Sequence, residues 1–355
     1  MDRAVSAVAG AAAGAAMGAA AGTAAGAVMD ATMGAVAGAS RKLDVYAIGE
    51  LNADLVLAGL NAIPPLGREY LCRESALLLG SSTAICACVM SSLGLKTGFV
   101  GALGMDAFGD VCHATLGRYG VDTARVRRDA ALRTGLTVCL SVGGDRAMVT
   151  HLGNTIDCVA AGDIPEAVPE EARHVHIGSF FLNRKLAVGL PAWLERARAK
   201  GMTVSLDAGF QEAQDWDGGL SGVLPLVDVF FPNREEVRGI GRSDDTLEAA
   251  RRVRAMMRGG ALVVKLGADG ALAISEDGEL RREAYPATVV DTTGAGDSFN
   301  AGFLHAWLAG RPLDACLCYG NAAGAVSVGR MGGTSRCPTL GEVERCIRLG
   351  RAGEP

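Results

Sequence analysis

The stretch Asp291–Leu304, which reads DTTGAGDSFNAGFL, combines a glycine-rich turn with a carboxylate at the start of an apolar helix. The first peptide NH groups of such a helix have no partner within the helix, so they attract anions, phosphate above all. Here these groups belong to Gly294, Ala295, Gly296 and Asp297. The Asp297 carboxylate beside this anion hole is suited to remove the proton from an attacking hydroxyl. The segment therefore predicts a phosphoryl-transfer site.

A structural interpretation of Asp297 is the alternative. Aspartate in a first helical turn interacts favourably with the helix dipole, and short Gly-x-Gly turns are common. The length of the whole stretch favours the catalytic interpretation over this helix cap. No G-x-x-x-x-G-K-[ST] motif occurs anywhere in the sequence, which excludes a P-loop kinase.

The same stretch resembles the C-terminal motif of the ribokinase-like (PfkB) carbohydrate kinases, and it matches that motif at every restricted position. The resemblance extends from about Leu43 to Arg348. It implies an α/β fold, with a ribokinase-like doubly wound sheet flanked by helices and a small β lid. It also implies ATP-dependent phosphorylation of a hydroxyl of a sugar or sugar-like molecule, with Asp297 as general base and Gly294, Ala295 and Gly296 lining the anion hole.

Further segments resemble family motifs that hold ATP, Mg²⁺ and a monovalent cation. The residues implied for ATP and Mg²⁺ are Asn233, Glu236, Lys265, Gly267, Gly270 and Asn321. For the N-x-x-E motif at Asn233, an Asn-capped helix with an acidic first turn is the alternative. The family often has Thr at the position of Lys265, where a lysine could reach a phosphate as a point charge. Asp291 and Thr293 match a monovalent-cation (K⁺) site, which the carbonyls of Gly332 and Gly333 could complete.

The expected substrate side shows both a match and a departure. The segment Gly49–Asp54 resembles the family's sugar-binding opening, although an ordinary strand-end turn is the alternative. The residues expected to bind the substrate are Asn52, Asp54, Gly80, Ser81 and Ser82. Where the family has a second Gly and then an Asn, this chain has Ser81 and Ile85. It also lacks the nearby Lys or Asn that meets a substrate phosphate, which argues against a phosphosugar kinase.

A second departure follows the expected strand that ends at Leu206. The chain continues Asp-Ala-Gly-Phe, without the Asn and Arg that keto-deoxygluconate and fructose kinases often carry there. Asn154 is a weaker candidate for the pocket, and a turn residue after Gly153 is the favoured interpretation. Two rival functions stay open: a nucleoside kinase of the same fold, and a non-catalytic sugar or nucleotide sensor.

The body of the chain alternates short apolar runs with amphipathic stretches, which predicts a parallel sheet covered by helices. The expected strands are Val45–Ile48, Thr97–Val100, Arg133–Val142, His174–Ile177, Thr203–Leu206, Val227–Phe231 and Ala261–Leu266. The expected helices are Thr83–Leu93, Phe108–Tyr119, Lys185–Lys200, Leu247–Met257, Gly296–Leu308, Leu313–Val328 and Leu340–Leu349. We expect the lid at about residues 51–79, which lack helical periodicity, and family lids often pair into homodimers.

Composition separates this body from the beginning of the chain. Of the 355 residues, the first 40 contain 18 Ala and 7 Gly, with Gly at a period of four. We interpret this segment as a low-complexity extension. The alternatives are a glycine-zipper helix that packs in a membrane or against a partner, and a targeting segment. Ala and Gly are weakly apolar, and the extension has no Leu-rich core. We expect an Ala/Gly-rich extension at residues 1–42 and one kinase domain at residues 43–355.

Charge and cysteine usage exclude other classes of protein. The formal net charge of −5 and the pI of about 5.6 argue against a nucleic-acid partner. The ten cysteines form no C-x-x-C pair and no zinc-like spacing with histidine, so we expect reduced, buried thiols and structural or surface histidines. We expect a cytoplasmic enzyme with a small-molecule sugar substrate and ATP, and without membrane association.

Overall fold

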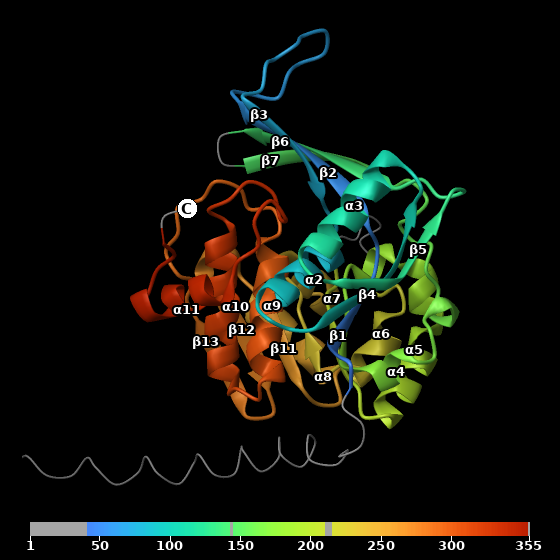
Figure 1. The fold of residues 1–355 in the computed structure, drawn as a ribbon. Coiled ribbons are helices and arrows are strands. Elements are labelled where there is room, and N and C mark those ends of the chain that lie inside the picture. Colours follow the sequence, from blue (N-terminus) through green and yellow to red (C-terminus); the bar gives the residue numbers. More distant parts are fainter. Residues whose placement is uncertain (1–40, 143–144, 210–214, 354–355) are drawn as a thin grey trace, which may run out of the picture. The chain divides into compact units, whose positions relative to one another are not determined.

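The computed structural model describes residues 41–142, 145–209 and 215–353 (Figure 1), so the extension expected at residues 1–42 lies almost wholly outside the described residues. In this part of the chain, nine strands form a central sheet in the order β13-β12-β11-β10-β9-β8-β1-β4-β5. All neighbours from β11 to β5 pair in parallel, and β12 and β13 add an antiparallel edge. The strands are β1 (Leu43–Ile48), β4 (Thr97–Gly104), β5 (Asp122–Asp129), β8 (Ala172–Ile177), β9 (Thr203–Leu206), β10 (Val229–Phe230), β11 (Ala261–Lys265), β12 (Ala271–Ser275) and β13 (Gly278–Arg282).

Helices cover both faces of this sheet, because successive side chains of a strand point to opposite faces. On β1, Val45 and Ala47 lie in one hydrophobic core, whereas Tyr46 and Ile48 lie in the other. The first core is closed by α2 (Ser82–Ser92), α3 (Ala107–Arg118), α9 (Ala295–Leu308), α10 (Leu313–Ser327) and α11 (Leu340–Leu349). The second is closed by α4 (Val168–Glu171), α5 (Arg184–Ala199), α6 (Leu220–Val223), α7 (Arg234–Gly241) and α8 (Thr246–Ala255). The α/β class with a sheet flanked by helices is confirmed.

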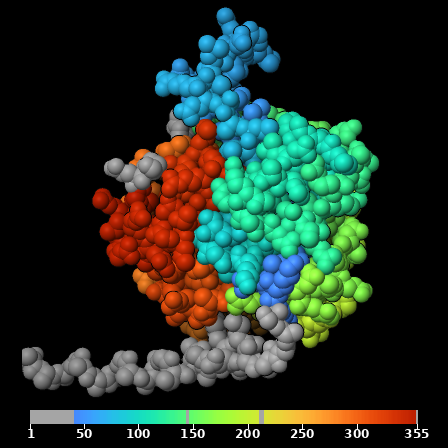
Figure 2. All heavy atoms as spheres, in the orientation of Figure 1, coloured from blue at the N-terminus to red at the C-terminus, as the bar shows by residue number. Residues whose placement is uncertain are grey.

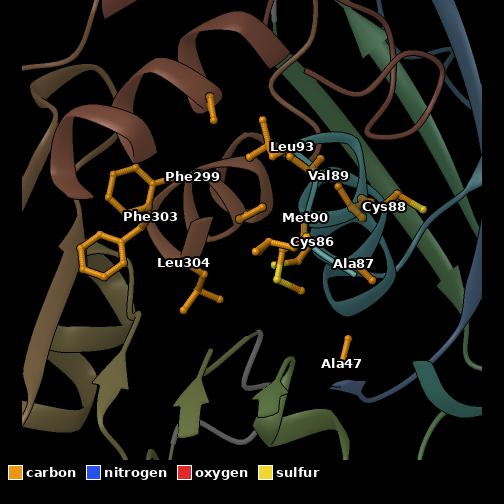
Figure 3. Packing of buried hydrophobic residues seen from close by; sticks show 14 of the residues in the cluster. Ala47, Cys86, Ala87, Cys88, Val89, Met90, Leu93, Phe299, Phe303 and Leu304 are labelled. Atoms are coloured by element: carbon orange, nitrogen blue, oxygen red, sulfur yellow. The ribbon is translucent and has the colours of Figure 1, made fainter. Parts of the chain in front are cut away.

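The contact between α2 and α9 brings the two ends of the expected site together. Figure 3 shows Cys86 and Met90 of α2 opposite Phe299 and Leu304 of α9. All four side chains are almost completely excluded from solvent. Burial of that kind contributes on the order of 1.5–3 kcal/mol per large apolar side chain. The helix start that carries Asp297 is therefore fixed against the helix that follows Gly80.

The described strands also form a second, smaller sheet, which is separate from the central one in its hydrogen-bonded pairing although its strands alternate along the chain with those of the central sheet. The described residues form four strands in the order β3-β2-β6-β7, which are β2 (Asn52–Leu60), β3 (Glu74–Leu79), β6 (Gly135–Val142) and β7 (Asp145–His151). The expected lid at residues 51–79 thus supplies half of this sheet. The assignment of Arg133–Val142 to the large sheet was wrong. Along β6 the residues alternate between buried and partly exposed positions, as in a sheet with one covered face.

The other expected strands each overlap a strand of the central sheet, and the seven expected helices are all present. Strand β5 was missed because it carries charged side chains at most positions, which an edge strand tolerates. The ten cysteines are free thiols, seven of them buried. Within the described residues, no helix is both long enough and apolar enough to span a membrane.

Candidate active site

Helix α9 begins at Ala295, and its cap Gly294 requires glycine for two reasons. The φ angle of Gly294 is 77°, in the left-handed region, and a Cβ atom there would lie 2.9 Å from Cα of Gly333. The first helical hydrogen bond runs from the Ser298 NH to the Gly294 carbonyl, so the NH groups of Gly296 and Asp297 precede the helical ladder. The Ala295 NH instead donates to the Thr292 carbonyl at 3.2 Å. The backbone donors available to an anion are thus fewer than the sequence predicted.

Asp297 lies in the first turn of this helix, among other carboxylates. Burial raises the pKa of Asp297 to about 8, and the nearby carboxylates of Asp207 and Glu50 add to this effect. The Lys265 ammonium and the hydroxyl of Ser82 act in the opposite direction. The pKa of this carboxyl therefore lies in the range in which general bases work.

An ion pair between Lys265 and Asp207 lies beside the start of α9. Lys265 ends β11 and Asp207 follows β9, and Nζ lies 2.5 Å from Oδ2. The Asn300 amide donates to the same oxygen at 2.6 Å. Burial disfavours the Asp207 anion, but Lys265 and Asn300 outweigh it and hold the pKa of Asp207 below its ordinary value. A Cβ atom on Gly296 would lie 3.7 Å from Nζ, so the lysine reaches the expected anion hole.

The N-x-x-E motif proves to be both a helix cap and a part of this charge cluster. The Asn233 side chain accepts from the Glu236 NH at 2.9 Å, and the Asn233 NH donates back to the Glu236 carboxylate at 2.7 Å. This capping box starts α7. Burial, with the charge of Asp207, raises the pKa of Glu236 to about 8. The two interpretations of this motif therefore do not exclude each other.

Asn52 and Asp54 lie at the beginning of the lid strand β2. The Asn52 amide donates to Asp54 Oδ1 at 3.0 Å and to Thr137 Oγ1 of β6 at 3.3 Å. Burial raises the pKa of Asp54 to about 6. A Cβ atom on Gly80 would lie 2.1 Å from Asp54 Oδ1, so glycine at position 80 makes room for this carboxylate. These three expected substrate residues are brought together.

Ser81 and Ser82 have different surroundings. Ser81 caps α2 with a φ of 69°: its hydroxyl accepts from the Ala84 NH at 3.1 Å and donates to the Glu50 carbonyl at 2.8 Å. These contacts give Ser81 a role in the fold. Ser82, the first residue of α2, lies close enough to Asp297 to lower the pKa of that carboxyl.

Glu50 was not predicted as a site residue, although it lies within the segment Gly49–Asp54 that was assigned to the substrate side. The Glu50 carboxylate is buried and accepts hydrogen bonds from the hydroxyls of Ser179 and Thr83, at 2.8 and 3.0 Å, and from the Asn183 amide at 3.2 Å. Its donors come from segments far apart in the chain, so no local pattern signals it. Glu50 ties the end of β1 to α2 and to the turn after β8.

Ile85 explains the departure from the family pattern at the start of α2. Its side chain is 3% exposed and lies against the loop of the phosphoryl-transfer motif. A Cβ atom on Gly294 would be 3.0 Å from Ile85 Cγ2, and one on Gly333 would be 2.5 Å from Cδ1. Ile85 therefore packs against Gly294 of the motif and against Gly333 of the loop after α10. Apolar packing replaces the polar contact that the family motif implies at this position.

The expected K⁺ site and nucleotide residues form two further groups. Asp291 accepts from the NH and hydroxyl of Thr293, at 2.9 and 2.8 Å, and from the Gly332 NH at 2.8 Å. These bonds join the loop before α9 to the loop after α10. Asn321 and Gly270 both meet the end of β13: the Asn321 amide donates to the carbonyls of Arg282 and Glu283.

The remaining expected residues are placed as follows. A Cβ atom on Gly270 would lie 2.0 Å from the Arg282 carbonyl, whereas Gly267 (φ 64°) has open space around its Cα. Asn154 is a turn residue: it accepts from the Arg133 NH and donates to the Ala131 carbonyl. It is not a member of the charge cluster.

The assembled site is a helix start beside one lysine and several carboxylates, an arrangement suited to phosphoryl transfer. A family model for the pfkB family carbohydrate kinases matches residues 43–340. The chain is 31% identical over 301 residues to an ATP-dependent ribose-1-phosphate kinase of Halopiger xanaduensis, covering 84% of this chain and 96% of the relative. It is 29% identical over 251 residues to an uncharacterised sugar kinase of Archaeoglobus fulgidus, covering 70% and 98%.

The fold leads to the same family. A putative ribokinase II of E. coli, solved in complex with ATP and Mg²⁺, superimposes with a TM-score of 0.76 at 23% identity, covering 86% of this chain and 99% of that one. The central sheet with its small β lid is thus the ribokinase fold. This chain belongs to the pfkB family of carbohydrate kinases, and it is a kinase of that family.

The Lys265–Asp207 pair leads to a prediction about stability. Lys265→Met leaves the buried Asp207 without its cation, and we expect it to lower the free energy of unfolding by about 3–5 kcal/mol. The double variant Lys265→Met/Asp207→Asn recovers most of this loss, because no uncompensated charge stays buried. Denaturant unfolding measures all three proteins. Lys42→Met, at the exposed Lys42–Asp122 pair, is the control and costs less than about 1 kcal/mol. A loss equal to that of the control would contradict the assignment.

Proposed function

We propose that this protein transfers the terminal phosphoryl group of ATP to a hydroxyl of a sugar or sugar-like molecule, with Asp297 as general base. One observation carries the proposal: Asp297 lies in the first turn of α9, close enough to both the Lys265 ammonium and the Ser82 hydroxyl for each to lower its pKa. A base in this place adjoins both a phosphate-binding helix start and the side on which Asn52, Asp54 and Gly80 meet. The family membership supports the same activity.

In the proposed reaction the Asp297 carboxylate accepts the proton of the substrate hydroxyl. The freed oxygen forms a bond to the terminal phosphorus, the bond from that phosphorus to its bridging oxygen breaks, and ADP leaves. Lys265 and the NH groups of Gly296 and Asp297 lie where negative charge develops, and such fixed donors lower the barrier. Asn52 and Asp54 orient the acceptor through its hydroxyls.

The carboxylate side chains of this site fit ATP that binds together with Mg²⁺. Besides the larger effect of burial, the charge of Asp207 raises the pKa of Glu236 and of Asp297, so a cation bound here would relieve the repulsion between these carboxylates. Carboxylate oxygens are the ligands that Mg²⁺ prefers. Among the described residues no group of three or more side chains forms a metal site by itself. This suits an ion that takes its other ligands from phosphates and water, and Mg²⁺ bound there would neutralise phosphate charge.

For the nucleotide, the proposed contacts are the residues that the sequence singled out. They are Asn233, Glu236, Lys265, Gly267, Gly270 and Asn321. The charge cluster around Lys265 would face the phosphates, whereas Gly270 and Asn321, which meet at the end of β13, would lie on the nucleoside side. A K⁺ ion held by Asp291 and Thr293 would stabilise the loop that precedes the anion hole.

Asn in place of Asp297 tests the general base. We expect Asp297→Asn to lower kcat by about 10²–10⁴-fold, because an amide cannot accept the proton, while ATP still binds. The acid limb of the wild-type pH profile, on which kcat/KM rises as the base ionises, disappears with it. Coupled ADP release and calorimetric ATP binding are the measurements.

Ser298→Ala is the matched control in the same helical turn. The Ser298 hydroxyl is buried and has no hydrogen-bond partner among the described residues, so its removal leaves turnover unchanged. Full turnover by Asp297→Asn would refute the proposed base.

We also propose that the lid forms a homodimer. The segment between β2 and β3 stands out from the body (Figure 2) and exposes Leu66 and Leu71 at 103% and 88%. Exposed apolar side chains gathered in one segment mark an interaction surface. Light scattering should give a dimeric mass for the wild type and a monomeric mass for Leu66→Asp/Leu71→Asp. Leu349→Asp, on α11, leaves the dimer intact. A monomeric wild type would exclude this assembly.

The third proposal concerns residues 1–40. We propose that the Ala/Gly-rich extension takes no part in catalysis, because every expected site residue lies at or beyond Asn52. A protein that starts at Arg41 should keep the kcat and KM of the full chain in the same ADP-release assay. A loss of activity with the fold retained, as judged by circular dichroism, would show that the extension contributes to the site.

A further inference from the structure

One buried threonine joins the lid to the loop that follows α10. Thr334 lies between α10 and α11, and its side chain is completely excluded from solvent. Its hydroxyl donates to the carbonyl of Leu79, the last residue of the lid strand β3, at 2.7 Å. The two residues are 255 positions apart in the chain. A buried carbonyl needs a hydrogen-bond partner, so this bond fixes where the end of β3 lies.

The Leu79 end of this bond lies next to the residues proposed to bind the acceptor. Leu79 is followed by Gly80, which connects the lid strand to the N-cap of α2. The Gly80 NH donates to the Asn52 carbonyl at 2.9 Å, and a Cβ atom on Gly80 would lie 2.1 Å from Asp54 Oδ1. A shift of the Leu79 carbonyl would therefore move the backbone against which the Asp54 carboxylate packs.

The Thr334 end of the bond is held against the phosphoryl-transfer motif. Two residues earlier, the Gly332 NH donates to the Asp291 carboxylate at 2.8 Å. The next residue, Gly333, is so close to the motif that a Cβ atom on Gly294 would lie 2.9 Å from its Cα. Gly294 is the cap of α9, the helix that carries the proposed base. The loop that contains Thr334 is therefore packed against the start of that helix.

Helix α3 holds the backbone of Thr334 in place. The Thr334 carbonyl accepts from the hydroxyl of Tyr119 at 3.0 Å and from the Arg118 guanidinium at 3.4 Å. Tyr119 is the C-cap of α3, and its oxygen also accepts from the Cys337 NH at 3.1 Å. Because its carbonyl is anchored in this way, Thr334 presents its hydroxyl to the lid from a fixed position.

We propose that Thr334 is a positioning residue for phosphoryl transfer. Its bond to the lid sets the distance between an acceptor held by Asp54 and the carboxylate of Asp297. This inference rests on the proposed kinase activity. The reacting atoms tolerate little error, since a displacement of about 1 Å can lower the rate by about 100-fold. Thr334 acts through the backbone at Leu79 and Gly80, and a role of this kind affects only reactions whose acceptor is bound by the lid.

Thr334→Val tests this role, because it removes the hydroxyl and keeps the shape of the side chain. The acceptor is whichever of a panel of sugars, sugar phosphates and nucleosides gives the wild type its highest kcat/KM. With that acceptor we expect kcat to fall by about 10–100-fold while KM for ATP stays unchanged. Thr334→Ser keeps the donor and should restore most of kcat. Thr334→Ala lacks the donor and should behave as Thr334→Val, which guards against a defect peculiar to valine.

ADP release without any acceptor separates positioning from a general loss of structure. In that reaction water attacks the terminal phosphorus, the bond to the bridging oxygen breaks, and ADP and phosphate leave. Water needs no contact with the lid, so Thr334→Val should hydrolyse ATP at the wild-type rate. All rates are measured at a temperature at which circular dichroism shows that each variant is folded.

Ser335→Ala is the matched control in the same loop. The exposed Ser335 hydroxyl donates to the Met331 carbonyl, a bond confined to this loop, so its removal leaves kcat unchanged. An undiminished kcat in Thr334→Val, failure of Thr334→Ser to restore it, or an equal loss of ATP hydrolysis would overturn the positioning role.

The failure of the kinase proposal has a different signature. If no member of the panel increases ADP release by the wild type, the kinase proposal fails. Hydrogen exchange then decides about Thr334 separately. Faster exchange in Thr334→Val at the amides of both β3 and the first turn of α9, absent in Thr334→Ser, supports a link between the lid and that helix. Any other pattern of exchange overturns it.

Discussion

The charge balance around Lys265 is the constraint on which the rest of the site depends. Four carboxylates, Glu50, Asp207, Glu236 and Asp297, gather at the carboxyl ends of the parallel strands and at two helix starts. The buried Lys265, bonded to Asp207, is the cation whose charge acts on Asp207, Glu236 and Asp297. Without Lys265, repulsion between the like charges would raise the pKa values of the carboxyls until they bind protons, or it would push the two helices apart. A nucleotide that binds together with a cation would neutralise the negative charge that remains in this cluster.

The geometry of the strands makes this balance possible. Because β9, β10 and β11 are parallel neighbours, Asp207 and Lys265 emerge at the same edge of the sheet although 58 residues separate them. Helix α9 then brings Asp297 and Asn300 to that edge, and Ile85 of α2 supports the turn at Gly294 from beneath. The acceptor side is built differently, from the first strand of the lid and from Gly80. The proposed base thus lies on a helix that packs on the central sheet, whereas Asn52 and Asp54, the residues proposed to bind the acceptor, lie on the small sheet.

The local motifs were largely predictable and the long-range contacts were not. Helix α9, its glycine cap and Asp297 follow from a turn and an apolar period within fourteen residues. The capping box at Asn233 and Glu236 is equally local. The contacts of Glu50 and the pairing of Lys265 with Asp207 depend on which strands become neighbours. The pattern of a single sequence does not specify this. Strand β6 was placed in the wrong sheet because its run of residues also suits a buried strand.

The central claim is that burial among carboxylates, moderated by Lys265, tunes Asp297 to act as a base near neutral pH. Carbon-13 NMR titration of aspartate side chains in the free protein, with Asp297→Asn to assign the signal, measures this property directly. The account predicts a titration near pH 8 for Asp297. A midpoint near the ordinary aspartate value of about 4 would show that this carboxylate is neither buried nor crowded enough, and would contradict the account.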